Sequence, residues 1–155
     1  MEGQLFCKSD AAADFTQLDK KEVLVESFLD PDNRIGVVGV SKDRGKWGYR
    51  VYRHLREEGL NVYPINPKYV EIEGAECFPE VAAVDDGLDV VVTVVPPEVT
   101  EEIVRQCARV GVKRVWMQPG SESDEAVDFC REHGIEVVHD ACMVIDGLEQ
   151  EYEEV

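Results

Sequence analysis

The stretch from Arg34 to Gly48 reads R-I-G-V-V-G-V-S-K-D-R-G-K-W-G, and it decides the fold. Its apolar residues Ile35, Val37 and Val38 predict a buried β-strand, and the glycines around them predict a tight loop that leads into a helix. In parallel α/β proteins this arrangement binds phosphate groups, because the loop N–H groups and the positive end of the helix dipole face one anion. The stretch therefore predicts an α/β protein with a nucleotide-like ligand.

Basic residues gather in and after this loop, although the chain carries a formal net charge of −17. Residues 42–56 contain one acid, Asp43, and six basic side chains: Lys42, Arg44, Lys46, Arg50, Arg53 and Arg56. The last three fit the solvated face of an amphipathic helix. The first three precede that helix, where no periodicity accounts for them, so they favour an anion site.

The glycine spacing distinguishes this loop from two common nucleotide sites. NAD sites use G-x-G-x-x-G and an acid about 20 residues later, after the second strand. Here the second strand is followed by Asn66-Pro67-Lys68, and the chain has no G-x-x-x-x-G-K-[ST] loop. A small NAD(P)-dependent oxidoreductase is therefore the second hypothesis. A vestigial Rossmann domain that serves protein association is the third.

Strand and helix patterns alternate from residue 34 to residue 145. They predict a Rossmann-like, doubly wound parallel sheet of five or six strands in a single α/β domain. The expected strands span 34–40, 61–65, 89–95, 113–117 and 135–139, with a short one near 74–77. The expected helices span 48–58, 98–110 and 122–133. We expect three parts: an N-terminal extension over 1–33 with one helix at 17–29, the domain over 34–146, and an acidic tail over 147–155.

Composition disfavours several other classes of protein. The five cysteines show no C-x-x-C and the three histidines no H-x-x-x-H, which disfavours structural zinc and a disulfide framework. Strong acidity disfavours nucleic-acid binding. The longest apolar run, Val90 to Pro97, is far shorter than the roughly 20 residues that span a bilayer. We therefore expect a soluble, cytoplasmic protein without a membrane or nucleic-acid partner.

The loops at the carboxyl ends of the expected strands are the candidate site, because ligands of doubly wound sheets bind there. They are Gly39-Val40-Ser41, Asn66-Pro67-Lys68, Val95-Pro96-Pro97, Gln118-Pro119-Gly120 and Asp140-Ala141-Cys142. Taken singly, each of these loops is also an ordinary connection between a strand and a helix.

Taken together, these loops resemble the CoA-binding domain family. Its members are small Rossmann-like proteins related to the N-terminal domain of the succinyl-CoA synthetase α subunit and to ADP-forming acyl-CoA synthetases. The resemblance covers about residues 25–145 and is carried by V-V-G-V-S (37–41), K-W-G (46–48), N-P-K (66–68), V-P-P-E (95–98), W-M-Q-P-G (116–120) and D-A-C (140–142). It implies CoA or an acyl-CoA as the ligand.

The resemblance also implies a role for each loop. Gly39, Val40 and Ser41, with Lys46 and Gly48, would hold the CoA phosphates. The Asn66-Pro67-Lys68 loop would lie near the adenosine and its 3′-phosphate. Val95 and Pro96 would pack on the nucleotide, and Gln118, Pro119 and Gly120 would line the path of the pantetheine arm. Val94-Val95 departs from the Phe-Arg common in the family, and Ala141 stands where an arginine is often found.

No catalytic constellation accompanies these residues. The related synthetases need a further domain with a phosphorylated histidine, and His139 has no aligned acid or base in the sequence. For Cys142 a buried, inert thiol is favoured over one that forms a mixed disulfide with the CoA thiol. The expectation is therefore a protein that is not an enzyme, a CoA carrier or sensor. The partners left open are a second copy of the chain and a larger acyl-CoA enzyme.

Overall fold

The computed structural model describes residues 27–139. The chain divides into two compact units, Met1–Asp30 and Pro31–Val155, and the second contains the sheet. The helix expected over 17–29 overlaps the described residues only at its end, where residues 27 and 28 are helical. The tail over 147–155 and the Asp140-Ala141-Cys142 loop lie outside the described residues.

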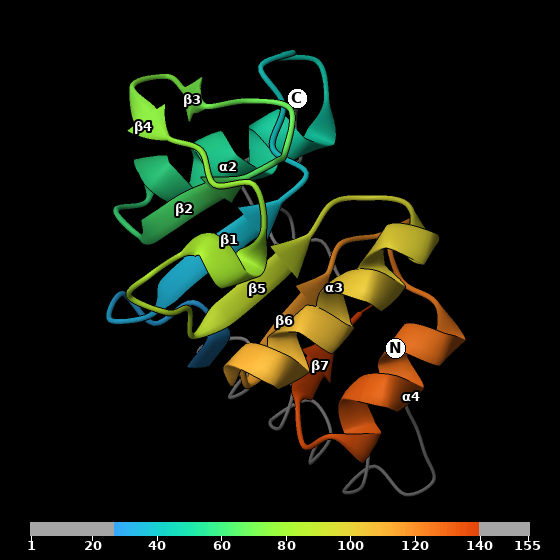
Figure 1. Cartoon of the computed structure of the whole chain (residues 1–155). Helices are drawn as coiled ribbons and strands as arrows, with labels where there is room; N and C mark the ends of the chain where they lie inside the picture. The colour runs from blue at the N-terminus through green and yellow to red at the C-terminus, as the bar shows by residue number, and fades with distance from the viewer. Residues whose placement is uncertain (1–26, 140–155) are drawn as a thin grey trace, which may run out of the picture. The chain divides into compact units, whose positions relative to one another are not determined.

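Five parallel strands form the central sheet in the order β2-β1-β5-β6-β7 (Figure 1). They are β1 (Arg34–Val38), β2 (Asn61–Ile65), β5 (Val90–Thr93), β6 (Arg114–Met117) and β7 (Glu136–Val138). Val38, the last residue of β1, pairs with Ile65 of β2 on one side and Thr93 of β5 on the other. The prediction of a Rossmann-like parallel sheet is confirmed.

The sixth expected strand, near 74–77, does not join this sheet. Residues 71–76 instead form a separate antiparallel hairpin of β3 (Glu71–Ile72) and β4 (Ala75–Glu76). The two strands have only two residues each, and Gly74 lies in the turn between them. The hairpin extends the connection from β2 to β5.

Helices cover both faces of the sheet. α2 (Trp47–Glu57) leads from β1 to β2, whereas α3 (Pro97–Val110) and α4 (Asp124–Glu132) lead from β5 to β6 and from β6 to β7, in the opposite direction across the sheet. Right-handed crossovers therefore place α2 on one face and α3 and α4 on the other. A short 3₁₀ helix, η1 (Val81–Ala83), contributes Val81 to the core beneath α3.

Alternation along the strands divides the buried side chains between the two layers. Val91, Val115 and Met117 share a core with Ile103 and Cys107 of α3. Their neighbours along β5 and β6 point to the opposite face because successive side chains alternate, and Val90, Val92 and Trp116 are fully buried there. α2 buries Val51, Tyr52 and Leu55 and exposes Arg50, Arg53 and Arg56, as predicted for an amphipathic helix.

Strand order reverses between β1 and β5, and this reversal positions the site. The chain leaves β1 toward β2 on one side and leaves β5 toward β6 on the other. In doubly wound sheets ligands bind at the carboxyl edge, near such a reversal of strand order. Within residues 27–139, no helix is both long enough and apolar enough to cross a membrane.

Candidate functional site

The start of α2 lies directly against the loop that follows β1. A Cβ atom built on Gly48 would lie 2.0 Å from the carbonyl oxygen of Gly39, and one on Gly39 would lie 2.2 Å from the carbonyl oxygen of Val94. Gly39 also has a φ of 102°, which favours glycine. Both positions thus require glycine, and the first turn of α2 is fixed against the carboxyl ends of β1 and β5.

This corner presents unbonded backbone donors. Within the described residues, the N–H groups of Val40, Ser41 and Lys42 have no hydrogen-bond partner. In α2 the first intrahelical bond is donated by Arg50 to the carbonyl of Lys46, and no side chain caps the helix start. The N–H groups at that start therefore remain available, as at every uncapped helix N-terminus. The N–H groups of the β1–α2 loop and those at the start of α2 therefore lie close together, where Gly39 contacts Gly48.

The electrostatics of this corner also favour an anion. The first turn of α2 contains no acidic residue, whereas α4 begins with Asp124 and Glu125 and is capped by Ser123, whose Oγ accepts a hydrogen bond from the Ala126 N–H at 3.1 Å. Acidic side chains and a cap thus stabilise the positive end of the α4 dipole. The positive end of the α2 dipole has no such partner and can stabilise an anionic ligand.

Short hydrogen bonds hold the loop between β1 and α2 in shape. Ser41 Oγ accepts from the Asp43 N–H at 3.0 Å, and Asp43 Oδ1 accepts from the Gly45 N–H at 2.9 Å. The Lys46 N–H then donates to the carbonyl of Asp43 at 3.1 Å. Lys46 itself is exposed and forms no ion pair with any described residue. Its ammonium group is free to bind an anion at the helix start.

Asn66 joins the loop after β2 to the loop after β1. Its Nδ2 donates to the carbonyl of Val40 at 2.8 Å, and its Oδ1 accepts from the Lys68 N–H at 2.9 Å. Val40 is fully buried, so it supports this junction from within and its side chain does not reach the surface. Lys68 and Pro67 are exposed at the outer side of this junction. The structure thus brings the Gly39-Val40-Ser41 and Asn66-Pro67-Lys68 loops together.

A second contact between these loops was not predicted. The Lys42 Nζ lies 5.4 Å from the ring centre of Tyr69, a cation–π distance. The sequence shows the charge of Lys42 but gives no direct sign that Tyr69 lies beside it. Each residue directly follows one of the predicted loop motifs, and this adjacency was the available signal.

The loops after β5 and β6 enclose a separate open pocket of about 280 Å³. Four of the predicted site residues line it, namely Val95, Pro96, Pro119 and Gly120, together with Val94 and Ser121. Its walls are mostly aliphatic, which suits an uncharged, partly apolar chain better than a phosphate group.

Gln118 does not line this pocket, although the sequence placed it on the ligand path. Its side chain is only 3% exposed. Its carbonyl accepts from Ser121 Oγ at 2.8 Å, and Ser121 Oγ also lies 2.8 Å from Thr93 Oγ1. This buried network fixes the turn from β6 toward α4. Gln118 is placed to shape the loop rather than to touch a ligand with its side chain.

The described cysteines are buried. Burial raises the pKa of the Cys107 thiol to about 12 and that of Cys130 to about 11. Burial also raises the pKa of Cys77, whose Sγ lies 3.5 Å from the carbonyl of Asn66. A thiol with a raised pKa stays neutral and is a poor nucleophile, so these three residues do not supply covalent chemistry.

Comparisons with known proteins show the family of the chain. A sequence profile described as CoA binding domain matches residues 33–147. Over 86 residues the chain is 40% identical to an ADP-forming acetate–CoA ligase of Methanocaldococcus jannaschii, an alignment that covers 56% of this chain and 12% of the ligase.

Solved structures show the same fold. A hypothetical protein from Pyrococcus horikoshii superposes with a TM-score of 0.75 and 34% identity, over 79% of this chain and 86% of that one. The dinucleotide-forming acetyl-coenzyme A synthetase 1 of Ca. Korarchaeum cryptofilum, in its apo form, superposes with a TM-score of 0.63 and 34% identity, over 74% of this chain and 27% of that one. The chain thus spans only a small part of the ligases that it resembles.

These comparisons correct the expectation that the chain is not an enzyme. That expectation followed from the lack of a catalytic constellation in the sequence. The regions similar to this chain in the ligase and the synthetase are parts of enzymes. A CoA-binding domain of an enzyme can lack catalytic residues of its own, so their absence does not separate a non-enzyme from one component of an enzyme.

Proposed function

Because the chain belongs to the CoA binding domain family, we propose that it binds CoA at the carboxyl ends of β1, β2, β5 and β6. The observation that carries this proposal is the corner formed by the β1–α2 loop and the uncapped start of α2. Its free N–H groups, its helix dipole and the exposed Lys46 are the elements that stabilise a diphosphate.

The adenosine end of CoA belongs beside the loop after β2. Lys68 is exposed there, next to the Asn66 side chain that connects this loop to the diphosphate corner. An ammonium group suits a 3′-phosphate, whereas NAD would present a ribose diol that needs an acidic partner. Lys42 and Tyr69 lie at the same end and offer a cation and an aromatic face.

The pantetheine arm belongs along the pocket between the loops after β5 and β6. Val95 and Pro96 form one wall of the pocket, and Pro119 and Gly120 form the other. These residues offer aliphatic surface and no charge, so the arm would be held by apolar contact and by exposed backbone. The pocket is open, so both free CoA and a short acyl-CoA are candidate ligands.

We further propose that the chain works together with an acyl-CoA enzyme. The support is its similarity to parts of longer ligases and synthetases. In such an arrangement this domain would hold the CoA while another polypeptide or domain supplies the chemistry of acyl transfer.

Calorimetric titration with CoA, dephospho-CoA, acetyl-CoA and NAD tests the proposal. We expect CoA to bind and NAD not to bind. Dephospho-CoA should bind more weakly by about 1–3 kcal/mol because it lacks the 3′-phosphate. Lys46→Ala should weaken CoA binding by a similar amount. Arg109 is an exposed arginine on α3, so Arg109→Ala should change CoA binding little.

Two results would contradict this proposal. Binding of NAD without binding of CoA would favour the oxidoreductase. Equal affinity of the wild type and Lys46→Ala for CoA would show that the diphosphate does not bind beside Lys46 at the start of α2.

A further inference from the structure

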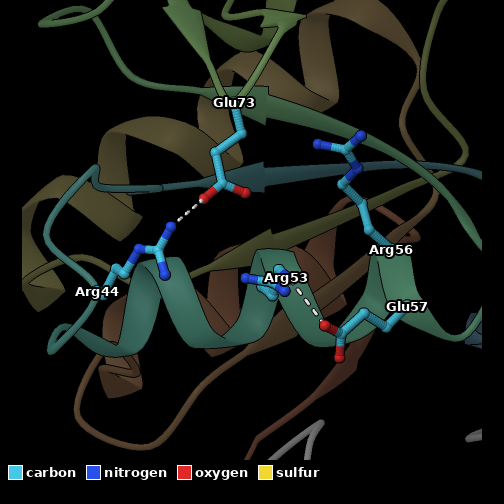
Figure 2. A pocket seen from close by; sticks show the side chains of 5 residues that line it. All are labelled: Arg44, Arg53, Arg56, Glu57 and Glu73. Carbon is cyan, nitrogen blue, oxygen red and sulfur yellow. Dashed lines mark ion pairs between the residues drawn. The ribbon is translucent and has the colours of Figure 1, made fainter.

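The exposed side of α2 carries an open cleft that the CoA site does not use. Figure 2 shows five charged side chains around it: Arg44, Arg53, Arg56, Glu57 and Glu73. Arg44 comes from the loop before α2, Glu73 from the β3–β4 turn, and the other three from α2 itself. The cleft has a volume of about 510 Å³.

The cleft extends away from the CoA site. Arg53 and Arg56 lie six and nine residues after the first residue of α2. At 1.5 Å per residue they are about 9 and 14 Å along the helix axis from the corner proposed for the diphosphate. A phosphate group held by these two arginines would therefore be distinct from the diphosphate of CoA.

The net charge of the cleft is opposite in sign to that of the whole chain. Three arginines against two glutamates give the cleft a net charge of +1, in a protein of formal charge −17. Arg53 pairs with Glu57 at 2.8 Å, but the carboxylates do not neutralise every arginine. Arg56 forms no ion pair with any described residue, and Arg44 approaches Glu73 only to 3.7 Å with 76% of its side chain exposed.

Two tyrosines hold the arginine side chains in place. The guanidinium groups of Arg44 and Arg56 lie 5.7 and 5.4 Å from the ring centres of Tyr49 and Tyr52, respectively. Arg56 also donates to the Tyr52 hydroxyl at 3.1 Å, and Arg53 donates to the Tyr49 hydroxyl at 2.7 Å. Since both tyrosine rings are buried in the core, the guanidinium groups are positioned before any ligand arrives.

Glu73 places its side chain in the cleft although its backbone conformation is unfavourable. Its φ is 51°, and it is the one described non-glycine residue with a positive φ. Asn or Gly is favoured at this place in a two-residue hairpin turn. Glu73 nevertheless presents a carboxylate that accepts from the Tyr49 hydroxyl at 2.7 Å and faces Arg44. A carboxylate here takes the place that an anionic ligand would take.

We propose that this cleft binds a phosphate-bearing anion, with Arg53 and Arg56 as its main ligands and Glu73 as an internal competitor. Guanidinium groups fixed in a fork geometry are matched to phosphate oxygens. The Glu73 carboxylate repels such an anion and lowers its affinity. Removing an arginine should therefore weaken anion binding, whereas removing the charge of Glu73 should strengthen it. A purely structural role of the cleft does not predict these opposite effects.

The test is a calorimetric titration with inorganic pyrophosphate in the presence of saturating CoA, which occupies the corner at the start of α2. We expect one site for pyrophosphate. Arg53→Gln and Arg56→Gln should each weaken it by about tenfold to a hundredfold. Glu73→Gln keeps an acceptor for Tyr49 but removes the charge, so it should tighten binding. Arg109→Gln, on α3, is the matched control and should have no effect, and circular dichroism verifies the fold of each variant.

Three results would overturn the proposal. The first is no pyrophosphate binding by either the wild type or Glu73→Gln. The second is binding that is lost in Lys46→Ala but kept in Arg56→Gln, because the anion would then lie at the start of α2; this comparison can be made even if CoA does not bind. The third is binding of an acidic peptide such as oligoglutamate without binding of pyrophosphate, which would assign the cleft to a protein partner.

Discussion

At the scale of single residues, the contact between Gly39 and Gly48 determines what the site can be. The carbonyl of Gly39 lies where a side chain at Gly48 would begin. Only a chain without Cβ at this position allows α2 to approach the loop after β1 so closely. The helix dipole acts over a short range, so this approach is what brings it to the ligand.

Gly48→Ala should therefore destabilise the fold and weaken CoA binding together. The new Cβ would lie 2.0 Å from a backbone oxygen that cannot rotate away, so α2 must shift. We expect a loss of about 1–3 kcal/mol in the free energy of unfolding, the usual cost of overpacking, measured by urea denaturation.

Gly45→Ala is the matched control in the same loop. Its Cβ would meet nothing closer than Asp43 Oδ1 at 3.4 Å, and Gly45 does not have a positive φ. Its stability should be unchanged or slightly higher, because alanine restricts the unfolded chain. Equal stability of the two variants would show that α2 can move away from the loop without cost.

At this scale the sequence predicts site residues where a residue type has one physical role, and their contact with a ligand stays a prediction. The glycines and loop lysines were placed at the candidate site by their chemistry alone. The sequence does not show the burial of Gln118, whose carbonyl accepts from Ser121 Oγ beside Thr93 of β5. It also missed the contact of Lys42 with Tyr69, because a contact between distant loops leaves no local pattern.

At the scale of elements, the strands and helices were predicted to within a few residues because their apolar patterns are long. The helices are followed by glycines in left-handed geometry, with φ values of 84° at Gly59, 87° at Gly111 and 73° at Gly134. The sequence predicts only one short strand where the β3–β4 hairpin lies, because two-residue strands are too short to show alternation. The cleft beside it, which depends on Glu73, could not be predicted for the same reason.

The packing of α3 on α4 predicts a specific dependence of stability on pH. The buried Cys107 of α3 belongs to the core that α3 shares with α4, and burial raises its pKa to about 12. Below the unfolded pKa of 9.0 its contribution to stability is complete. Above that value the unfolded chain loses the thiol proton more readily than the folded chain, so stability falls as the pH rises toward the folded pKa.

Comparison of the wild type with Cys107→Val isolates this effect. Between about pH 8 and pH 10 the wild type should lose about 1 kcal/mol more than the variant, measured by urea unfolding. Valine has no titrating group and a similar size, so tyrosines and lysines affect both proteins alike. Parallel curves would mean that Cys107 is ionised as easily in the folded protein as in the unfolded chain.

At the scale of the whole molecule, charge is distributed unevenly. The chain has 33 acidic and 16 basic side chains, so even complete pairing would leave 17 carboxylates without a partner. The basic residues are concentrated along α2 and the loop before it, which is where both anion sites are proposed. Elsewhere the described arginines mostly contact glutamates, as Arg114 does with Glu136 at 3.0 Å. An anion approaching this protein is therefore repelled by most of its surface and attracted to one face of α2 and its loop.

The same imbalance predicts that sodium chloride stabilises the fold. Mutual repulsion of carboxylates is relieved as the Debye length shortens from about 10 Å at 0.1 M salt to about 3 Å at 1 M. Screening also weakens the exposed ion pairs, but these contribute only about 0–1 kcal/mol each and are fewer than the unpaired acids. The Tm should therefore rise from low to high sodium chloride, measured by differential scanning fluorimetry. Phosphate and sulfate must be avoided because they could occupy the anion sites.

Two variants outside α2 and its loop separate repulsion from ion pairing. Asp128 on α4 is exposed and forms no ion pair with a described residue, so Asp128→Asn should raise the Tm at low salt, and this gain should shrink at high salt. Glu136 is paired with Arg114, so Glu136→Gln should give no such gain. A Tm that falls with sodium chloride, or an equal gain from both variants, would mean that excess carboxylates do not limit the stability of this fold. The basic side of α2 would then matter for ligands alone and not for balancing the charge of the chain.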